Sequence, residues 1–231
     1  MFYRPLSLLF IIILTGLLSF IVAFLFFGLI STAFTRIGFT WSDALLLLFL
    51  SLIGSGINIP VATLRSNIPI VQERYIRVFG INYRIPFRKT IHTTTTLAVN
   101  VGGAVIPSLV SIYLVTRFPE CLLICIAATA LVAIITWMVA KPVKGVGIVT
   151  PAFVPPLAAA LSAMLFVNLF QAPHDLLFAT AYIGGTLGTL IGADILNLRK
   201  IRDLGAPVAS IGGAGTFDGV FLAGIIAVLL V

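Results

Sequence analysis

Long apolar runs, separated by short polar or basic links, make up almost the whole chain. Most runs reach the roughly 20 residues that a helix needs to cross a bilayer. The pattern predicts about seven transmembrane helices in an all-α polytopic membrane protein, with a single membrane domain over residues 1–231. The expected spans are Leu6–Phe34, Asp43–Pro60, His92–Thr116, Cys121–Ala140, Val146–Phe170, Asp175–Leu198 and Val208–Val231.

One long hydrophilic stretch interrupts this pattern, between the second and third expected spans. In VQERYIRVFGINYRIPF, β-forming residues alternate with charged ones around Gly80 and Asn82. That alternation is typical of a β-hairpin. We therefore expect residues 61–91 to form a short, basic, cytoplasmic β-hairpin-like insertion.

Glycine, proline and asparagine interrupt several spans near their ends. Asn100, Gly102 and Gly103 lie near the start of the third span, and Pro155 and Pro156 near the start of the fifth. Proline inside a helix start kinks it or leaves it extended. Irregular backbone at membrane depth persists only where protein or a wet cavity covers it. These five residues are therefore candidates for supporting a site.

Glycine spacing predicts where helices approach closely. Gly184, Gly188 and Gly192 recur every four residues on the sixth span, and Gly215 and Gly219 begin a similar ridge on the seventh. Small residues at this spacing let another helix pack closely. We expect these ridges to bring the sixth and seventh spans together.

Composition excludes a soluble domain, because 60% of the residues are hydrophobic and only 9% are charged. Soluble domains are about a quarter charged. The net charge of +7 comes from basic residues between the apolar runs, where topology signals lie. We therefore expect the lipid bilayer, and not a nucleic acid, as the partner of these charges. Cys121 and Cys125 are expected to be inert packing residues, and no metal site and no cofactor are predicted.

The basic residues also predict the orientation. If seven spans alternate, one side of the membrane receives only Arg36 and Arg117 of the 14 lysines and arginines. Positive residues favour the cytoplasmic side. The chain is therefore expected in the cell membrane with its N-terminus cytoplasmic and its C-terminus external.

Two carboxylates, Asp194 and Asp218, lie in the last two apolar runs. A charged residue inside a bilayer costs roughly 2.5–3.5 kcal/mol on insertion scales, so each acid is a candidate functional residue. Two carboxylates that share a site hold one proton between them. The ionised acid then activates a water while the protonated one polarises a carbonyl, which is aspartic-protease chemistry. Asn197, Gly213 and Gly215 lie close to the acids in sequence and are expected to support them.

Two other interpretations use the same residues. Asp194, Asn197, Asp218 and Asn100 form a proton or cation site in a transporter. In a non-catalytic membrane protein, Asp194 pairs with Arg199 or Arg202, and Asp218 caps the last helix after a glycine turn.

The layout of the two acids resembles the presenilin and signal-peptide-peptidase class of intramembrane aspartyl proteases. In that class one Asp lies near the cytoplasmic end of a sixth helix and a second follows Gly-x-Gly on the seventh. Here two residues separate Gly215 from Asp218, where the class has none, and Pro156-Leu157-Ala158 precedes the acids although the class's Pro-Ala-Leu follows them. The resemblance implies a catalytic dyad and a membrane-spanning protein substrate.

A closer resemblance covers nearly the whole chain. VNVGGAVIP (Val99–Pro107), GADILNL (Gly192–Leu198) and GTFDGVFL (Gly215–Leu222) are similar to an uncharacterised family of archaeal and bacterial membrane proteins, domain-of-unknown-function family 1614. That resemblance implies a polytopic membrane protein and supplies no activity.

Overall fold

The structure is a computed structural model that describes residues 5–78, 81–143, 147–202, 207–213 and 219–231. Side chains are described at residues 8–65, 94–143, 147–201, 207–213 and 219–231.

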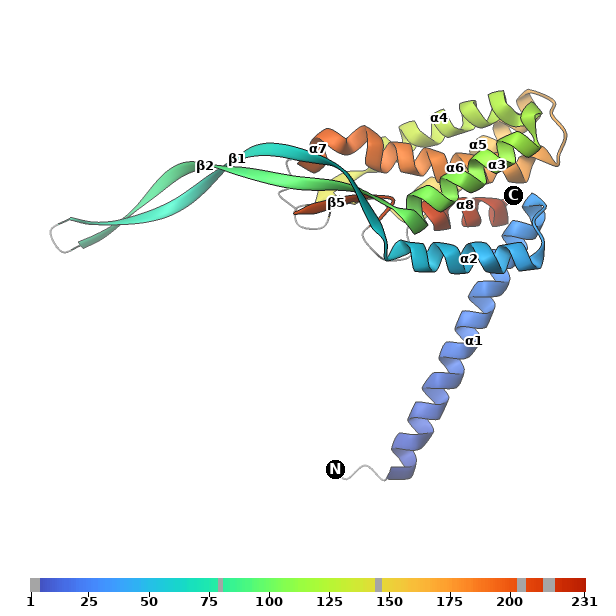
Figure 1. Ribbon diagram of the computed structural model, residues 1–231, viewed down its shortest axis with the longest axis horizontal. Coiled ribbons are helices and arrows are strands. Elements are labelled where there is room, and N and C mark those ends of the chain that lie inside the picture. Colours follow the sequence, from blue (N-terminus) through green and yellow to red (C-terminus); the bar gives the residue numbers. More distant parts are fainter. Residues whose placement is uncertain (1–4, 79–80, 144–146, 203–206, 214–218) are drawn as a thin grey trace.

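The chain is mostly helical, and most of its helices pack side by side in one bundle (Figure 1). The α-helices are α1 (Pro5–Ile37), α2 (Trp41–Ser55), α3 (Ile106–Arg117), α4 (Leu122–Val139), α5 (Val154–Leu169), α6 (Leu176–Thr189), α7 (Leu198–Arg202) and α8 (Gly219–Leu230). Three continuous helical segments are long and apolar enough to cross a membrane, namely Leu8–Ile37, Pro119–Val139 and Leu176–Ile201. Shorter apolar helices occupy the other four stretches in which spans were expected.

Two π-helical turns, Val101–Val105 (η1) and Leu190–Asp194 (η3), interrupt this regular pattern. The first leads into α3, and the second follows α6 directly. Short 3₁₀ turns, Pro119–Cys121 (η2) and Ile195–Asn197 (η4), lie beside α4 and η3. π-turns of a single turn are frequent at functional sites.

A three-stranded sheet lies at one end of the bundle. β1 (Asn58–Val78) and β2 (Ile81–Asn100) pair antiparallel and project well beyond the helices (Figure 1). β5 (Val208–Ile211) pairs parallel with the last turns of β2, with Thr96 opposite Val208 and Val99 opposite Ile211. A small second sheet joins β3 (Lys141–Val143) and β4 (Gly147–Val149).

The hairpin between the second and third helices is confirmed, but it is longer than the predicted residues 61–91. Strand pairing begins with Asn58 opposite Asn100 and continues to Val78 opposite Ile81. Helix two therefore ends at Ser55 and not at Pro60, and the third helical segment begins at Val101 and not at His92. The cluster Thr93–Thr96 is strand, because β-branched residues favour the pleated conformation.

Two other expected spans begin later than predicted. The fifth begins at Val154, since Lys141–Val149 contains the β3–β4 hairpin and Pro155 and Pro156 occupy the first helical positions. The seventh begins at Gly219 and not at Val208, because Val208–Ile211 joins the sheet as β5.

Gly184, Gly188 and Gly192 make the close helix contact that was predicted, but their partner is α4 and not the seventh span, as was expected. A Cβ atom at Gly184 would lie 3.5 Å from the Cβ of Ala128, and one at Gly188 would lie 2.6 Å from the Cβ of Val132. A Cβ at Gly192 would collide with the carbonyl oxygen of Ala133.

The second predicted ridge is not found. Nothing lies within 4 Å of a Cβ built at Gly219, and Gly215 lies outside the described residues. α6 and α8 instead approach through Gly185 and Gly224. A Cβ at Gly185 would lie 2.8 Å from the carbonyl oxygen of Ala223.

The core is apolar and centred on α6, whose Tyr182 is fully buried. The Phe34 ring lies with its centroid 6.0 Å from that of Tyr182 and 6.3 Å from that of Phe221, so α1, α6 and α8 meet there. Cys121 and Cys125 are buried free thiols in the same core, which agrees with their predicted packing role.

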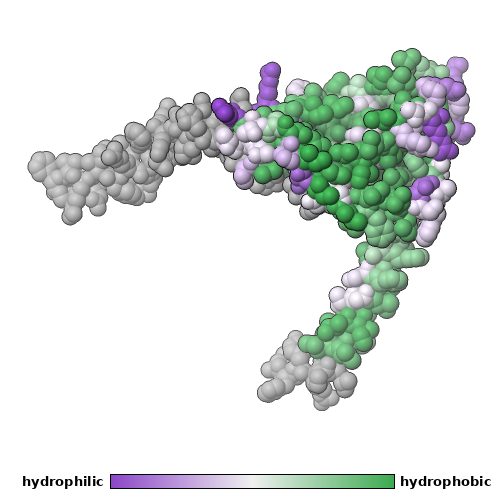
Figure 2. All heavy atoms as spheres, in the orientation of Figure 1, coloured by the Kyte–Doolittle hydropathy of each residue, from purple (hydrophilic) through white to green (hydrophobic). Residues whose placement is uncertain are grey.

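The outer surface of the bundle and of α1 is mainly apolar, and hydrophilic residues gather towards the two ends of the bundle (Figure 2). The N-terminal half of α1 leaves the bundle with large apolar side chains exposed on every face. Lys141, Arg199 and Lys200 are exposed near the sheet end. Arg36 and Arg117 bond to main-chain oxygens at the other end, those of Val228 and Gly38. This surface is typical of helices that are solvated by lipid.

Candidate functional site

Asp194 is the last residue of the π-turn η3 and is partly buried at the sheet end of the bundle. Its Oδ2 atom accepts a 2.7 Å hydrogen bond from the main-chain N–H of Gly212. Its Oδ1 atom has no hydrogen bond to any residue in the described part of the chain. Among residues with described side chains, no ion pair joins Asp194 to Arg199, the first of its two expected basic partners. One carboxylate oxygen is thus held by Gly212, and the other makes no hydrogen bond within the described residues.

Asn197 fixes the turn that carries Asp194. Its side chain is fully buried, and Nδ2 donates hydrogen bonds of 3.0 Å to the carbonyl oxygens of both Gly192 and Ala193. A π-turn leaves carbonyls of this kind without their usual helical partners. Asn197 therefore stabilises the irregular backbone just before Asp194.

Asn100 forms a clasp where the hairpin enters the bundle. It caps η1 by accepting a 2.8 Å hydrogen bond from the N–H of Gly103. Its Nδ2 atom donates to the carbonyl oxygen of Ser55 at 2.7 Å and to Oδ1 of Asn58 at 3.0 Å. Asn58 Oδ1 also accepts a hydrogen bond from the Ser210 hydroxyl at 2.5 Å. The clasp ties α2, β1, η1 and β5 together.

Gly102 is needed because backbones cross closely at η1. A Cβ at Gly102 would collide with the carbonyl oxygen of Ser51 and the N–H of Ser55. The Ser51 hydroxyl donates a 2.6 Å hydrogen bond to the carbonyl oxygen of Gly102. Gly102 thus serves helix packing, while Gly103 donates its N–H to the Asn100 cap.

Gly212 brings the two π-turns together. A Cβ at Gly212 would lie 2.6 Å from the Cβ of Ala104 in η1, while its N–H bonds Asp194 in η3. Gly212 and Gly213 have φ angles of 80° and 98°, a left-handed conformation that L side chains rarely adopt. The chain after β5 therefore turns sharply beside Asp194.

The remaining predicted site residues have no described contact with Asp194. Pro155 and Pro156 are buried in the first turn of α5, at the same end of the bundle as Asp194. Asp218 and Gly215 lie outside the described residues. In the sequence, Asp218 follows Gly212 by six residues and immediately precedes α8.

The sequence pattern predicted no role for Gly212 or Ser210, and it indicated Asn58 only as part of a helix end. Their roles depend on the parallel pairing of β5 with β2, which joins segments more than 100 residues apart. Gly-Gly after a short apolar run is a turn signal that marks Gly212 as a position to test.

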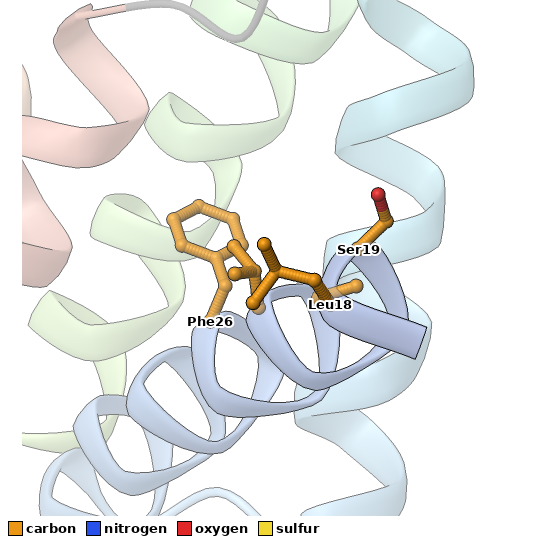
Figure 3. Close-up of a pocket in the computed structure, with 5 residues that line it drawn as sticks. Leu18, Ser19 and Phe26 are labelled. Atoms are coloured by element: carbon orange, nitrogen blue, oxygen red, sulfur yellow. The ribbon is translucent and has the colours of Figure 1, made fainter. Parts of the chain in front are cut away.

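Two surface hollows lie away from this site. One of about 400 Å³ is formed by α1 alone, with Leu18, Ser19 and Phe26 around it (Figure 3). Another of about 450 Å³ lies on the outer face of α4 and α6 and is almost entirely apolar. Both are typical of surface in contact with lipid chains. In the part of the chain with described side chains, no cluster of three or more His, Cys, Asp or Glu residues gathers that could hold a metal ion.

Comparison with known proteins gives one match. Residues 52–230 match the family described as "Protein of unknown function (DUF1614)". No curated protein and no solved structure matches the chain. These comparisons support the family resemblance and give no support to the resemblance to presenilin-type proteases.

Proposed function

Because the chain belongs to the DUF1614 family, whose description assigns no activity, we propose a function from its site. The proposal is an intramembrane aspartyl protease in which Asp194 and Asp218 share one proton and hydrolyse a peptide bond of a membrane-spanning substrate. The observation that carries it is the hydrogen bond from Gly212 to Asp194, since Gly212 begins the segment that contains Asp218.

Helix packing supports a meeting of the two acids. α6 and α8 run antiparallel, with Gly185 against Ala223 and Leu190 in the same buried cluster as Val220. Asp194 lies four residues after Leu190, and Asp218 lies two residues before Val220. We propose that α8 continues in this alignment as far as Asp218, which would bring the two acids within about one helical turn, or about 5.4 Å, of the same level.

The proposed chemistry needs one ionised and one protonated carboxylate. The ionised acid takes a proton from a water, which attacks the carbonyl carbon, while the protonated acid donates to the carbonyl oxygen. The acid that took the proton from water then gives it to the leaving nitrogen as the C–N bond breaks. The other acid takes a hydroxyl proton from the tetrahedral intermediate, so the pair again holds one proton. Oδ1 of Asp194, which has no hydrogen-bond partner among the described residues, would accept the hydrogen bond from this water.

β5 offers a way to hold the substrate extended. One of its edges pairs with β2, and its other edge has no strand partner in the described part of the chain. An unwound substrate segment added to that edge would run beside Gly212 and therefore past Asp194. The backbone of a transmembrane helix must be opened in this way before a peptide bond is exposed.

The membrane arrangement belongs to the same proposal. The four shorter apolar helices pack with the three long segments in one bundle, so we place all seven in the bilayer. The shortest described segment, Gly219–Leu230, spans about 18 Å at about 1.5 Å per residue. Exposed Lys141, Arg199 and Lys200 favour a cytoplasmic sheet end, with the N-terminus cytoplasmic and the C-terminus external.

A proton- or cation-coupled transporter is the second candidate, and one observation favours it. Asn197 Oδ1 and Thr136 Oγ1 are buried without a hydrogen-bond partner in the described structure, and both residues lie against Gly192. Amide and hydroxyl oxygens of this kind bind small cations. A stability that rises with sodium or potassium concentration, in wild type but not in Asn197→Ala, would support this alternative.

Two experiments test the protease. In a Cys121→Ala/Cys125→Ala background, the pair Asp194→Cys and Asp218→Cys should form a disulfide on mild oxidation, because that bond requires Cα atoms about 4.4–6.8 Å apart. Asp194→Cys with Val231→Cys, at the opposite end of the bundle, is the negative control. Failure of the first pair to cross-link in folded protein contradicts the dyad.

The second experiment measures hydrolysis in liposomes with a single-span reporter peptide that carries a Gly-Pro break near one membrane face. Asp194→Asn and Asp218→Asn should each abolish cleavage, whereas Asp43→Asn and Asp175→Asn, which replace acids elsewhere in the chain, should retain it. Cleavage that persists in either of the first two variants rejects the mechanism.

A further inference from the structure

Three hydroxyl-bearing residues form a row on one face of α6. Tyr182, Thr186 and Thr189 follow one another by four and three residues, which places them on the same helical face. Tyr182 and Thr186 are fully buried, and Thr189 is 3% exposed. A polar row inside an otherwise apolar bundle needs a physical reason.

The π-turn η3 brings Asp194 onto the same face. In an uninterrupted α-helix the five residues from Thr189 to Asp194 would turn about 500°, leaving Asp194 about 140° away from Thr189. A π-turn contains one extra residue and takes about 100° off that rotation, so Asp194 lies within about 40° of the row. The irregular turn thus aligns the carboxylate with the hydroxyls.

This face of α6 is directed towards α8. A Cβ at Gly224 of α8 would lie 2.5 Å from Thr186 Oγ1 and 3.2 Å from the Tyr182 ring. One helical turn further on, Leu190 packs in a cluster with Val220 of α8. The glycine ridge that faces α4 lies on a different side of α6. The hydroxyl row therefore borders the α6–α8 interface, and Asp194 follows it along the same face of the helix.

Two of the three hydroxyls lack a partner. The Thr186 hydroxyl donates to the carbonyl oxygen of Tyr182, but Tyr182 Oη and Thr189 Oγ1 have no hydrogen bond in the described structure. A buried hydroxyl without a partner is costly, and proteins usually satisfy such groups with internal water. Polar atoms at successive turns along one interface are suited to a chain of waters.

We propose that the α6–α8 interface is an internal water-binding site that runs from Tyr182 past Thr189 to Asp194. This inference rests on the proposed function for its purpose. Peptide hydrolysis consumes one water, whose hydroxyl joins the carbonyl carbon while its remaining proton goes to the amine. A site surrounded by lipid needs a store of that water, and the row supplies it to the face of Asp194.

The first test is X-ray hydroxyl-radical footprinting of the wild-type protein in nanodiscs. Radicals formed from bound water oxidise adjacent side chains, so Tyr182 should be oxidised although it is fully buried. Thr189→Val, which keeps the shape and removes the hydroxyl, should reduce Tyr182 oxidation several-fold. Thr180→Val is the matched control, because Thr180 is a buried threonine on another face of α6, with its hydroxyl 3.7 Å from Cys125 Sγ.

Thermal unfolding provides the second readout. If waters occupy the interface, Tyr182→Phe and Thr189→Val remove hydrogen bonds to them and lower the Tm. In a dry interface the same variants remove unsatisfied polar groups and raise the Tm. A raised Tm, or a wild-type Tyr182 that resists oxidation in folded protein, overturns the proposal. Neither readout depends on cleavage, so failure here is distinct from failure of the catalytic dyad.

Discussion

The N–H of Gly212 and the Oδ2 atom of Asp194 lie 2.7 Å apart across 18 residues of sequence. This hydrogen bond joins the end of β5 to the π-turn that ends α6. Because β5 pairs with β2, the position of Asp194 depends on the sheet as well as on the helix bundle. Variants that disturb either element should therefore affect the same carboxylate.

Gly212→Ala tests the turn beside Asp194. Its φ of 80° costs an L residue roughly 1–2 kcal/mol. The new methyl group would also meet Ala104 Cβ at 2.6 Å, and such overpacking adds about 1–3 kcal/mol. Gly147→Ala is the control, because Gly147 has a φ of 119° but open space around it. In thermal unfolding in detergent, Gly212→Ala should lower the Tm more than Gly147→Ala does. Equal decreases in Tm would show that Ala104 can move aside without cost.

Gly188→Ala tests the contact between α6 and α4. A Cβ there would lie 2.6 Å from Val132 Cβ, so the variant should lose about 1–3 kcal/mol of unfolding free energy. Gly28→Ala, with nothing within 4 Å, should be neutral or gain about 0.5–1 kcal/mol from better helix propensity. The comparison is made by thermal or denaturant unfolding in one detergent. Equal tolerance at both positions would contradict the close packing of α6 on α4.

Asn100→Ala tests the clasp between the hairpin and the bundle. The substitution leaves the Gly103 N–H and the Ser55 carbonyl without their partner, and each unpaired buried group costs about 1–3 kcal/mol. Asn100→Asp keeps the acceptor for Gly103 but loses both donated bonds. Both variants should lower the Tm, whereas Asn168→Ala, which removes an exposed amide bonded to Met164, should change it little. An unchanged Tm in Asn100→Ala would mean that the clasp adds no stability.

Membrane topology is the fourth prediction, and it depends on where the basic residues lie. A reporter fused after Val231 should be external, and one inserted at Gly80 should be cytoplasmic, because positive residues favour the cytoplasmic side. Protease protection of the two reporters in intact cells measures this. If both reporters lie on the same side, the seven-span arrangement and the proposed depth of Asp194 are wrong.

The sequence by itself determined the class of element at most positions. Apolar runs of bilayer length predicted the helical segments, alternation around Gly80 predicted the hairpin, and the spacing of Gly184, Gly188 and Gly192 predicted a close helix contact. Each of these signals is local, since the period of a helix or strand and the absence of a Cβ act over a few residues.

Tertiary structure alone decided where the helices end and how the site is built. The stretches His92–Asn100 and Val208–Ile211 are apolar or β-branched enough to begin a helix or a strand, and only their pairing with each other and with β1 selects the strand. Packing likewise decides that α4 is the partner of the glycine ridge. It also decides that α6 and α8 approach each other through Gly185 and Gly224. A π-turn leaves no local signature in composition, so the rotation that aligns Asp194 with Tyr182 and Thr189 is visible only once the backbone is folded.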